Sequence, residues 1–162
     1  MDLLLVRRLR PWSGNVGKRL VRAPKLYIRD SGLAHALLDI ETQEDLLGHP
    51  IAGPSWEGFA IENLIAAAGD RRTPYFYRTA DGAEIDLLFE RGGKVEIAIE
   101  IKRSTAPTLA KGFHSACAAL RPKEAFLVHG GSESWEESEG VTAIGLSALL
   151  RRFAKANNGN GK

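Results

Sequence analysis

Residues 84–102 decide the fold, and they read EIDLLFERGGKVEIAIEIK. In the stretch 94–102 the odd-numbered residues are bulky and apolar and the even-numbered ones are mostly polar, and the stretch 84–90 repeats this parity. A period of two predicts a strand with one face in the core. Two such strands joined by a glycine pair predict an antiparallel hairpin whose apolar faces coincide.

The length of the turn determines which residues of the hairpin face each other. A two-residue turn at the glycines would mix the polar and apolar faces. We therefore expect a three-residue loop, 92–94, which pairs Arg91 with Val95. Asp86 then lies opposite Glu100, with Cβ atoms roughly 5 Å apart.

Two facing carboxylates destabilise a sheet unless a cation lies between them or one takes up a proton. Oxygen ligands with neither His nor Cys nearby suit Mg²⁺ or Mn²⁺, so the pair is a candidate metal site. The alternative is that both acids are solvated on an open face. Lys102, two residues after Glu100 on the same face, could position a water beside the metal. It could instead form a cross-strand ion pair with Glu84, which the same register places opposite.

A third acid comes from a helix expected at 56–68, with Ser55 as its N-cap and Gly69 after its end. At 100° per residue, Glu57 falls on the apolar stripe that this helix must bury, whereas Glu62 points the other way. An acid on a buried face needs a partner, so Glu57 is a candidate third ligand. The alternative is a first-turn carboxylate interacting with the helix dipole.

The remaining elements follow from periodicity, capping residues and turn residues. We expect strands or an extended arm at 3–10 and 19–29, helices at 32–39, 107–120 and 147–156, strands at 75–78 and 124–129, an edge strand at 141–144, and a loop from 41 to 54. The core order is α, β, β, β, α, β. This predicts one α/β domain over residues 1–156, with a central mixed sheet flanked by helices, and a disordered tail at 157–162.

Composition excludes several classes of protein. The chain has 162 residues, 44% of them hydrophobic and 26% charged, which is typical of a globular domain rather than a disordered one. One cysteine, Cys117, excludes a disulfide framework and favours a cytoplasmic location. Arg7 and Arg8 interrupt the apolar start, so we expect neither a signal peptide nor a membrane span.

Basic charge is concentrated at the start of the chain. Residues 1–29 hold eight Lys or Arg against one acid, Asp2. Such a patch attracts nucleic-acid phosphates or an acidic partner, although a solvated strand pair is the alternative. The candidate nucleic-acid-binding residues are Lys18, Arg19, Arg22, Lys25 and Arg78.

The acid-bearing helix, the aspartate and the Glu100-Ile101-Lys102 stretch resemble the PD-(D/E)XK nuclease superfamily, although Ile85 stands where that pattern has proline. Several stretches are also similar to a domain of unknown function that follows the ATPase module in AAA-superfamily ATPases often called archaeal-type. These stretches are Lys18-Arg19-Leu20, Pro24-Lys25-Leu26-Tyr27, Asp30-Ser31-Gly32-Leu33-Ala34, Trp56-Glu57-Gly58-Phe59, Tyr77-Arg78-Thr79 and Asp81-Gly82-Ala83-Glu84-Ile85-Asp86. The resemblance implies a restriction-endonuclease-like αβββαβ core attached to an ATPase module.

Two functions follow as expectations. In the first, the chain hydrolyses DNA: Asp86 and Glu100 bind Mg²⁺ or Mn²⁺, Glu57 binds it directly or through water, and Lys102 positions the attacking water. In the second, the chain is a non-catalytic module that binds nucleic acid or a partner and regulates the attached ATPase. ATPase activity is not expected, because residues 14–19 have two residues where a phosphate-binding loop needs four. We interpret the chain as a fragment of a longer ATPase and leave oligomerisation open.

Overall fold

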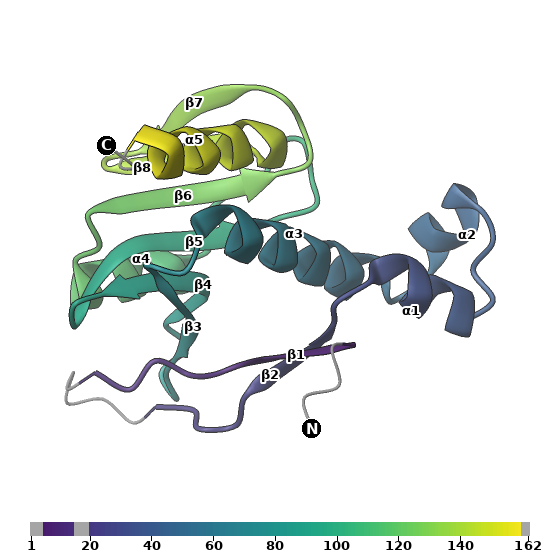
Figure 1. The fold of residues 1–162 in the computed structure, drawn as a ribbon, viewed down its shortest axis with the longest axis horizontal. Helices are drawn as coiled ribbons and strands as arrows, with labels where there is room; N and C mark the ends of the chain where they lie inside the picture. Colours follow the sequence, from purple (N-terminus) through teal and green to yellow (C-terminus); the bar gives the residue numbers. More distant parts are fainter. Residues whose placement is uncertain (1–4, 15–19, 160–162) are drawn as a thin grey trace.

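The computed structural model describes residues 5–14 and 20–159, which form a two-stranded sheet, a six-stranded sheet and five helices (Figure 1). The elements run in chain order β1 (Val6–Leu9), β2 (Lys25–Ile28), α1 (Ser31–Leu37), α2 (Gln43–Gly48), α3 (Ala52–Ala68), β3 (Thr73–Arg78), β4 (Glu84–Arg91), β5 (Lys94–Ile101), α4 (Lys111–Leu120), β6 (Glu124–His129), β7 (Ser134–Ser138), β8 (Val141–Gly145) and α5 (Leu146–Gly159). Within the described residues no helix is long and apolar enough to cross a membrane.

The six-stranded sheet is mixed and has the strand order β3-β4-β5-β6-β8-β7. β3, β4 and β5 pair antiparallel, β6 pairs parallel with both β5 and β8, and β7 closes the edge antiparallel to β8. A parallel pair needs a crossover, which α4 supplies between β5 and β6. The order α3-β3-β4-β5-α4-β6 confirms the predicted α/β core with a mixed central sheet flanked by helices.

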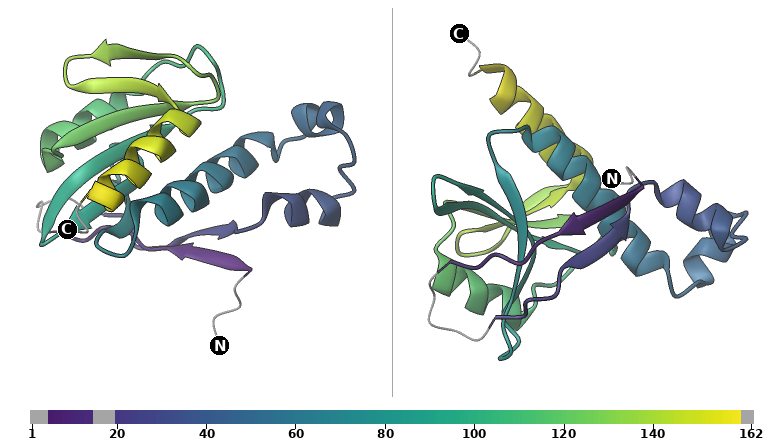
Figure 2. Two further views of the ribbon diagram at one scale, coloured as in Figure 1. Left: turned by 45° about the horizontal axis from the view of Figure 1, so that its top comes forward. Right: turned by 60° about the horizontal axis from the view of Figure 1, so that its bottom comes forward.

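Helices cover both faces of this sheet (Figures 1 and 2). α3 and α5 pack on one face in a core that includes Leu64, Phe126 and Phe153, and α4 packs on the other face through Phe113 and Ala116. We call these the α3 face and the α4 face. Since both are buried, the strands carry apolar residues on both sides, and polar-apolar alternation alone does not identify a face.

A β-bulge in β4 changes the predicted orientation of Asp86. Tyr75 pairs with Leu88 and Tyr77 pairs with Ile85, so two residues, Asp86 and Leu87, stand opposite the single residue between the tyrosines. Ile85 and Leu88 belong to the core on the α4 face, and Leu87 belongs to the core on the α3 face. The expected uniform parity of β4 is therefore wrong, and Asp86 lies on the α3 face with Leu87.

In the middle of the β4–β5 hairpin the strands pair as predicted, but the turn that joins them differs from the prediction. Arg91 pairs with Lys94 across a two-residue turn, not with Val95 across a three-residue loop as expected. Both turn glycines have positive φ, 60° and 76°, which this tight turn requires. Glu90 then pairs with Val95 and Phe89 pairs with Ile97, so Glu96 is an extra, bulged residue of β5. Beyond this bulge the pairing has the predicted offset, with Leu87 opposite Ile99. The predicted offset is confirmed there, whereas the predicted loop is wrong.

Helix boundaries differ from expectation where capping residues were misassigned. The expected loop at 41–54 contains α2, whose start is fixed by reciprocal bonds between Thr42 and Asp45. α3 begins at Ala52, so Ser55 lies inside the helix and its hydroxyl bonds His35 Nε2 at 2.7 Å instead of capping. α4 begins at Lys111, four residues after the expected proline.

The C-terminal region also differs from the expected pattern. β7 was not predicted, and its pairing makes β8 an interior strand rather than the expected edge. The last helix continues through residue 159, so residues 157–159 are helical rather than disordered, and residues 160–162 of the predicted tail lie outside the described part of the chain.

The N-terminal arm, residues 5–14 and 20–29, packs along α3 and the edge of β3. Leu9 of β1 is 1% exposed and belongs to the core on the α3 face. The Trp12 amide donates to the Phe76 carbonyl (2.7 Å), and the Val21 amide donates to the Arg78 carbonyl (3.0 Å). The arm therefore covers the exposed edge of the large sheet, which would otherwise offer unpaired backbone groups.

Candidate functional site

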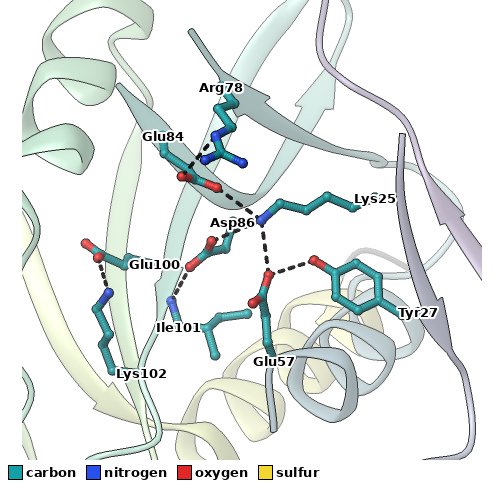
Figure 3. Close-up of polar contacts among 9 residues, drawn as sticks. All are labelled: Lys25, Tyr27, Glu57, Arg78, Glu84, Asp86, Glu100, Ile101 and Lys102. Carbon is teal, nitrogen blue, oxygen red and sulfur yellow. Dashed lines mark hydrogen bonds and ion pairs between the residues drawn. The ribbon is translucent and has the colours of Figure 1, made fainter. Parts of the chain in front are cut away.

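Lys25 of β2 lies among three carboxylates that come from α3 and β4 (Figure 3). Its Nζ lies 3.1 Å from Glu57 Oε1, 3.2 Å from Glu84 Oε1 and 3.3 Å from Asp86 Oδ1. We call these four residues the Lys25 cluster. Burial disfavours the ammonium, but Asp86 and Glu57 outweigh burial and raise the pKa of Lys25. Lys25 is therefore a cation held by the protein's own acids.

Tyr27 reinforces the cluster from the same side of β2. Residues two apart on a strand share a face, so Lys25 and Tyr27 both point toward α3, whereas Leu26 and Ile28 point outward and are exposed. The Tyr27 hydroxyl donates to Glu57 Oε1 at 2.6 Å, and burial together with this bond raises the pKa of the phenol. Glu57 therefore has two donors, which supports the predicted need for a partner.

Asp86 is held by both of its oxygens. Oδ1 faces Lys25, and Oδ2 accepts a 3.0 Å bond from the backbone amide of Ile101. Burial raises the pKa of Asp86, and Lys25 opposes this rise only in part. Glu84 is more exposed and pairs in addition with Arg78, whose Nε lies 3.5 Å from Glu84 Oε2.

Glu100 lies on the α4 face and pairs with Lys102. Glu100 lies between Ile99 and Ile101, which both face α3, and its Oε2 accepts a 3.2 Å bond from the Ala110 amide just before α4. Its Oε1 lies 2.8 Å from Lys102 Nζ. Burial disfavours the Lys102 ammonium, but this bond together with the negative charges of Glu100, Asp86 and Glu57 outweighs burial and raises the pKa of Lys102. Lys102 pairs with Glu100 and not with Glu84, so the alternative of a cross-strand ion pair with Glu84 is wrong.

The predicted ligands therefore divide into two groups. Glu57 and Asp86 meet on the α3 face, whereas Glu100 points to the other face because of the bulge at Asp86. Among the described residues, no group of three His, Cys, Asp or Glu side chains is arranged to hold a metal ion. The residues as placed here do not fit the Mg²⁺ or Mn²⁺ site expected from the sequence.

The candidate nucleic-acid-binding residues are also dispersed. Lys18 and Arg19 lie outside the described residues. Lys25 faces inward in its cluster, and Arg78 pairs with Glu84 while half of its side chain stays exposed. Arg22 is exposed and forms no ion pair with another described residue. Two of the five candidates thus neutralise the protein's own acids.

A groove of about 790 Å³ opens beside α3. Its walls come from α1, α2, α3 and the segments after β5 and β6, and they carry mainly apolar and aromatic side chains together with the charged residues Arg29, Asp30 and Arg103. The lining includes Arg29, His35, Leu47, Trp56, Phe59 and Arg103. The Trp56 and Phe59 rings lie 6.1 Å apart. This groove had no signal in the sequence, because its walls are far apart in the chain.

Exposed apolar side chains also lie on the elements that form the groove and on the outer face of β1 and β2. In the described ranges, every exposed large apolar residue lies between residues 5 and 59. They are Leu5, Val6, Leu26, Ile28, Leu33, Leu37, Leu38, Leu47 and Phe59. Single exposed apolar residues are ordinary, but their restriction to one third of the chain marks this side as a candidate interaction surface.

Sequence reasoning missed two members of the site. Tyr27 was not predicted, although its spacing from Lys25 places both on one face of a strand. Glu84 was considered only as an alternative partner of Lys102, because the bulge that turns Asp86 toward α3 was not expected. Leu88, an apolar residue at a nominally polar position, was the available signal that the parity of β4 is broken.

Two family models match the chain. One, a domain of unknown function (DUF8612), matches residues 1–44, and the other, a domain of unknown function (DUF4143), matches residues 52–149. The first covers the arm and α1, and the second runs from the start of α3 into α5. No solved structure matches the chain.

Two mycobacterial proteins are similar over most of the chain. The uncharacterized proteins Mb2031c of Mycobacterium bovis and Rv2008c of Mycobacterium tuberculosis are each 39% identical over 149 residues, which is 92% of this chain and 33% of theirs. The chain thus spans about a third of the length of these relatives. Because the DUF4143 model matches more than half of its residues, the chain belongs to the DUF4143 family of domains of unknown function.

Proposed function

We propose that this chain is a non-catalytic, partner-binding module of an AAA-superfamily ATPase, and that its N-terminal side docks on the ATPase module of the same parent protein. One observation carries the proposal: within residues 5–14 and 20–159, the exposed large apolar side chains all lie between residues 5 and 59. An apolar surface of this kind is typical of a face that is covered in an assembly.

The composition of the groove favours a protein partner with acidic and apolar side chains. Trp56 and Phe59 supply aromatic surface, which is enriched in interface centres. Arg103 also lines the groove, is exposed and forms no ion pair with another described residue. An arginine without a partner beside an apolar groove complements a carboxylate on the partner.

The choice of the ATPase module rests on the family and on the length of the relatives. DUF4143 domains are commonly found with AAA ATPases, and the two mycobacterial relatives have two thirds of their length outside the region matched here. A domain in such a protein has a partner surface permanently nearby, which raises its effective concentration. A cytoplasmic location fits this proposal, since Cys117 is a free thiol.

Metal-dependent DNA hydrolysis is the second candidate. The observation that favours it is the convergence of the α3 acid, Glu57, with the β4 acid, Asp86, as the nuclease resemblance implies. Against it stand the position of Glu100 on the other face and the ammonium of Lys25 between the acids. We therefore rank it below the binding function.

Binding of the chain to the remaining two thirds of the Mycobacterium tuberculosis relative tests the proposal. The two parts are produced separately and titrated by calorimetry, with the relative's own matching segment as the positive control. Phe59→Asp should weaken association by about tenfold or more, whereas Ala118→Asp, at an exposed position of α4, should not. Equal weakening by both changes, or no association of either segment, would contradict docking through this side.

The same protein preparation tests the second candidate function, metal-dependent DNA hydrolysis. Incubation with plasmid DNA and Mn²⁺ should leave the DNA intact. Cleavage that disappears in Asp86→Asn would instead favour the nuclease.

A further inference from the structure

We propose that Lys25 is the permanent cation of the cluster formed by Glu57, Glu84 and Asp86, in the place where a nuclease-like core would hold a divalent metal. The N-terminal arm, which carries Lys25, therefore blocks metal binding at this site. The proposal does not depend on the docking function, because it concerns the inner face of β2 and not the outer face or the groove.

The spacing of the oxygens fits an ammonium. The three carboxylate oxygens lie 3.1 to 3.3 Å from one point, Lys25 Nζ. Mg²⁺ holds its ligands at about 2.0–2.1 Å and Ca²⁺ at about 2.3–2.6 Å. Any such ion would have to draw the three acids inward and displace the lysine. An ammonium needs neither change, because its three N–H donors reach oxygens at hydrogen-bond distance.

Lys25 is fixed in place from several sides. Lys25 pairs with Leu9 in the β1–β2 sheet, and Leu9 is buried in the core on the α3 face. Its Nζ also lies 5.6 Å from the centre of the Phe76 ring, which favours a cation at that position. Only 22% of the side chain is exposed. The ammonium is therefore part of the packed structure rather than a mobile surface charge.

Separating Lys25 from the three carboxylates would be energetically unfavourable, because it leaves their negative charges unbalanced. Without the lysine, the buried Asp86 and its neighbours Glu57 and Glu84 would lose the cation that contacts all three, since among the described residues Arg78 pairs with Glu84 and Lys102 pairs with Glu100. A buried charge left without its partner is strongly destabilising. The same imbalance would attract another cation. Removal of the Lys25 charge should therefore allow the three acids to bind a divalent metal ion.

Titration with Mn²⁺ of the whole 162-residue chain tests the proposal. The variants are Lys25→Met, which keeps most of the side chain without its charge, Lys25→Arg as the charge-retaining control, and the double variant Lys25→Met with Asp86→Asn. We expect Lys25→Met to bind Mn²⁺ about tenfold or more tighter than the wild type, a gain of about 1.4 kcal/mol or more. Lys25→Arg should resemble the wild type, and the double variant should lose the gain.

Two results would overturn the proposal. One is a folded Lys25→Met protein, judged by circular dichroism, with no greater affinity for Mn²⁺ than the wild type. The other uses the wild type alone: a Tm that rises with Mn²⁺ and no longer does so in Asp86→Asn would show that the metal already enters past the lysine. If Lys25→Met fails to fold, this second measurement decides by itself, with an unchanged Tm as the expected result.

Discussion

The two sheets of this molecule differ in where they place apolar side chains. The six-stranded sheet is covered by α3 and α5 on one face and by α4 on the other, and its large apolar residues are buried. The two-stranded sheet is covered on one face only: Leu9 and Tyr27 pack toward α3, while Val6, Leu26 and Ile28 are exposed. One sheet is complete in itself, and the other presents a face that the described chain does not cover.

The arm has one observed role and one proposed role, on opposite faces of the same strands. Its inner face carries the lysine and the tyrosine that close the carboxylate cluster, and its outer face carries part of the proposed docking surface. Because neighbouring residues on a strand point to opposite faces, a four-residue strand is enough to supply both. Substitutions on the inner face should therefore lower the stability of the fold, whereas substitutions on the outer face should weaken partner binding.

The largest effect is expected on the inner face, at Leu9. This side chain is 1% exposed within the core on the α3 face, so Leu9→Ala should lower the free energy of unfolding by about 2–5 kcal/mol. Urea denaturation followed by circular dichroism measures the change. Leu37→Ala, at a residue that is 71% exposed, is the matched control and should change stability by no more than about 0.5 kcal/mol. A Leu9 effect as small as the control's would show that the arm is not part of the folded core.

A smaller effect is expected at Glu62, the second anchor of the arm. Glu62 accepts hydrogen bonds from Arg7 and Arg29 and is largely buried, which corrects the expectation that it points away from the packed side of α3. Glu62→Gln should cost about 1–3 kcal/mol at neutral pH, because it removes a carboxylate from two guanidinium groups. Glu44→Gln on exposed α2 is the matched control.

The loss at Glu62 should depend on pH in a defined direction. Burial alone would raise the pKa of Glu62, but its bonds to Arg7 and Arg29 outweigh burial and lower it. A lowered pKa contributes stability above the unfolded value of about 4.3, and this contribution disappears as the pH falls through the folded pKa. The wild type and Glu62→Gln should therefore converge in acid. A difference that stays constant from pH 7 to pH 3 would exclude this ion pair as the cause.

The sequence predicted the order of the core elements well and the faces of the strands poorly. Glycine turns and apolar periodicity are local signals, and they gave the helix-strand order around Glu57 and the hairpin after Asp86. The two bulges are set by packing on both faces of the sheet, and no residue type in 84–102 marks them except Leu88. One bulge was enough to move Asp86 away from Glu100.

Members of the candidate site were predictable where a local pattern marks each one, as the apolar helix stripe marks Glu57 and the strand hairpin marks Asp86. The partnership of Glu57 with Asp86 was expected, whereas the contact of Lys25 with Asp86 spans 61 positions. Lys25 was instead expected to bind nucleic acid, because a basic run in a sequence does not show which of its members faces inward. The alternating exposure along β2 supplies that information, and it appears only when the strand is packed on α3.

Asp86 should affect stability less than Glu62, since two contributions oppose each other there. Burial raises its pKa, so the ionised carboxyl costs stability that its bonds to Lys25 and to the Ile101 amide partly restore. A raised pKa means that stability is lost as the pH rises from the unfolded value of about 3.9 through the folded pKa. Relative to Asp86→Asn, the wild type should therefore become less stable between pH 4 and pH 7. Paired denaturation curves at these pH values measure the difference, and an opposite slope would mean that Lys25 dominates the pKa of Asp86.

The smallest effect on stability is expected on the outer face of the arm, at Leu26. This side chain is 66% exposed and lies between Lys25 and Tyr27, which both point inward. Leu26→Ser should change the free energy of unfolding by no more than about 0.5 kcal/mol, because it removes no buried contact. If the outer face belongs to the docking surface, the same change should weaken binding to the ATPase part of the relative. A stability loss above about 1 kcal/mol that grows with protein concentration would instead mean that a second copy of the chain covers Leu26, since association stabilises the folded state by mass action.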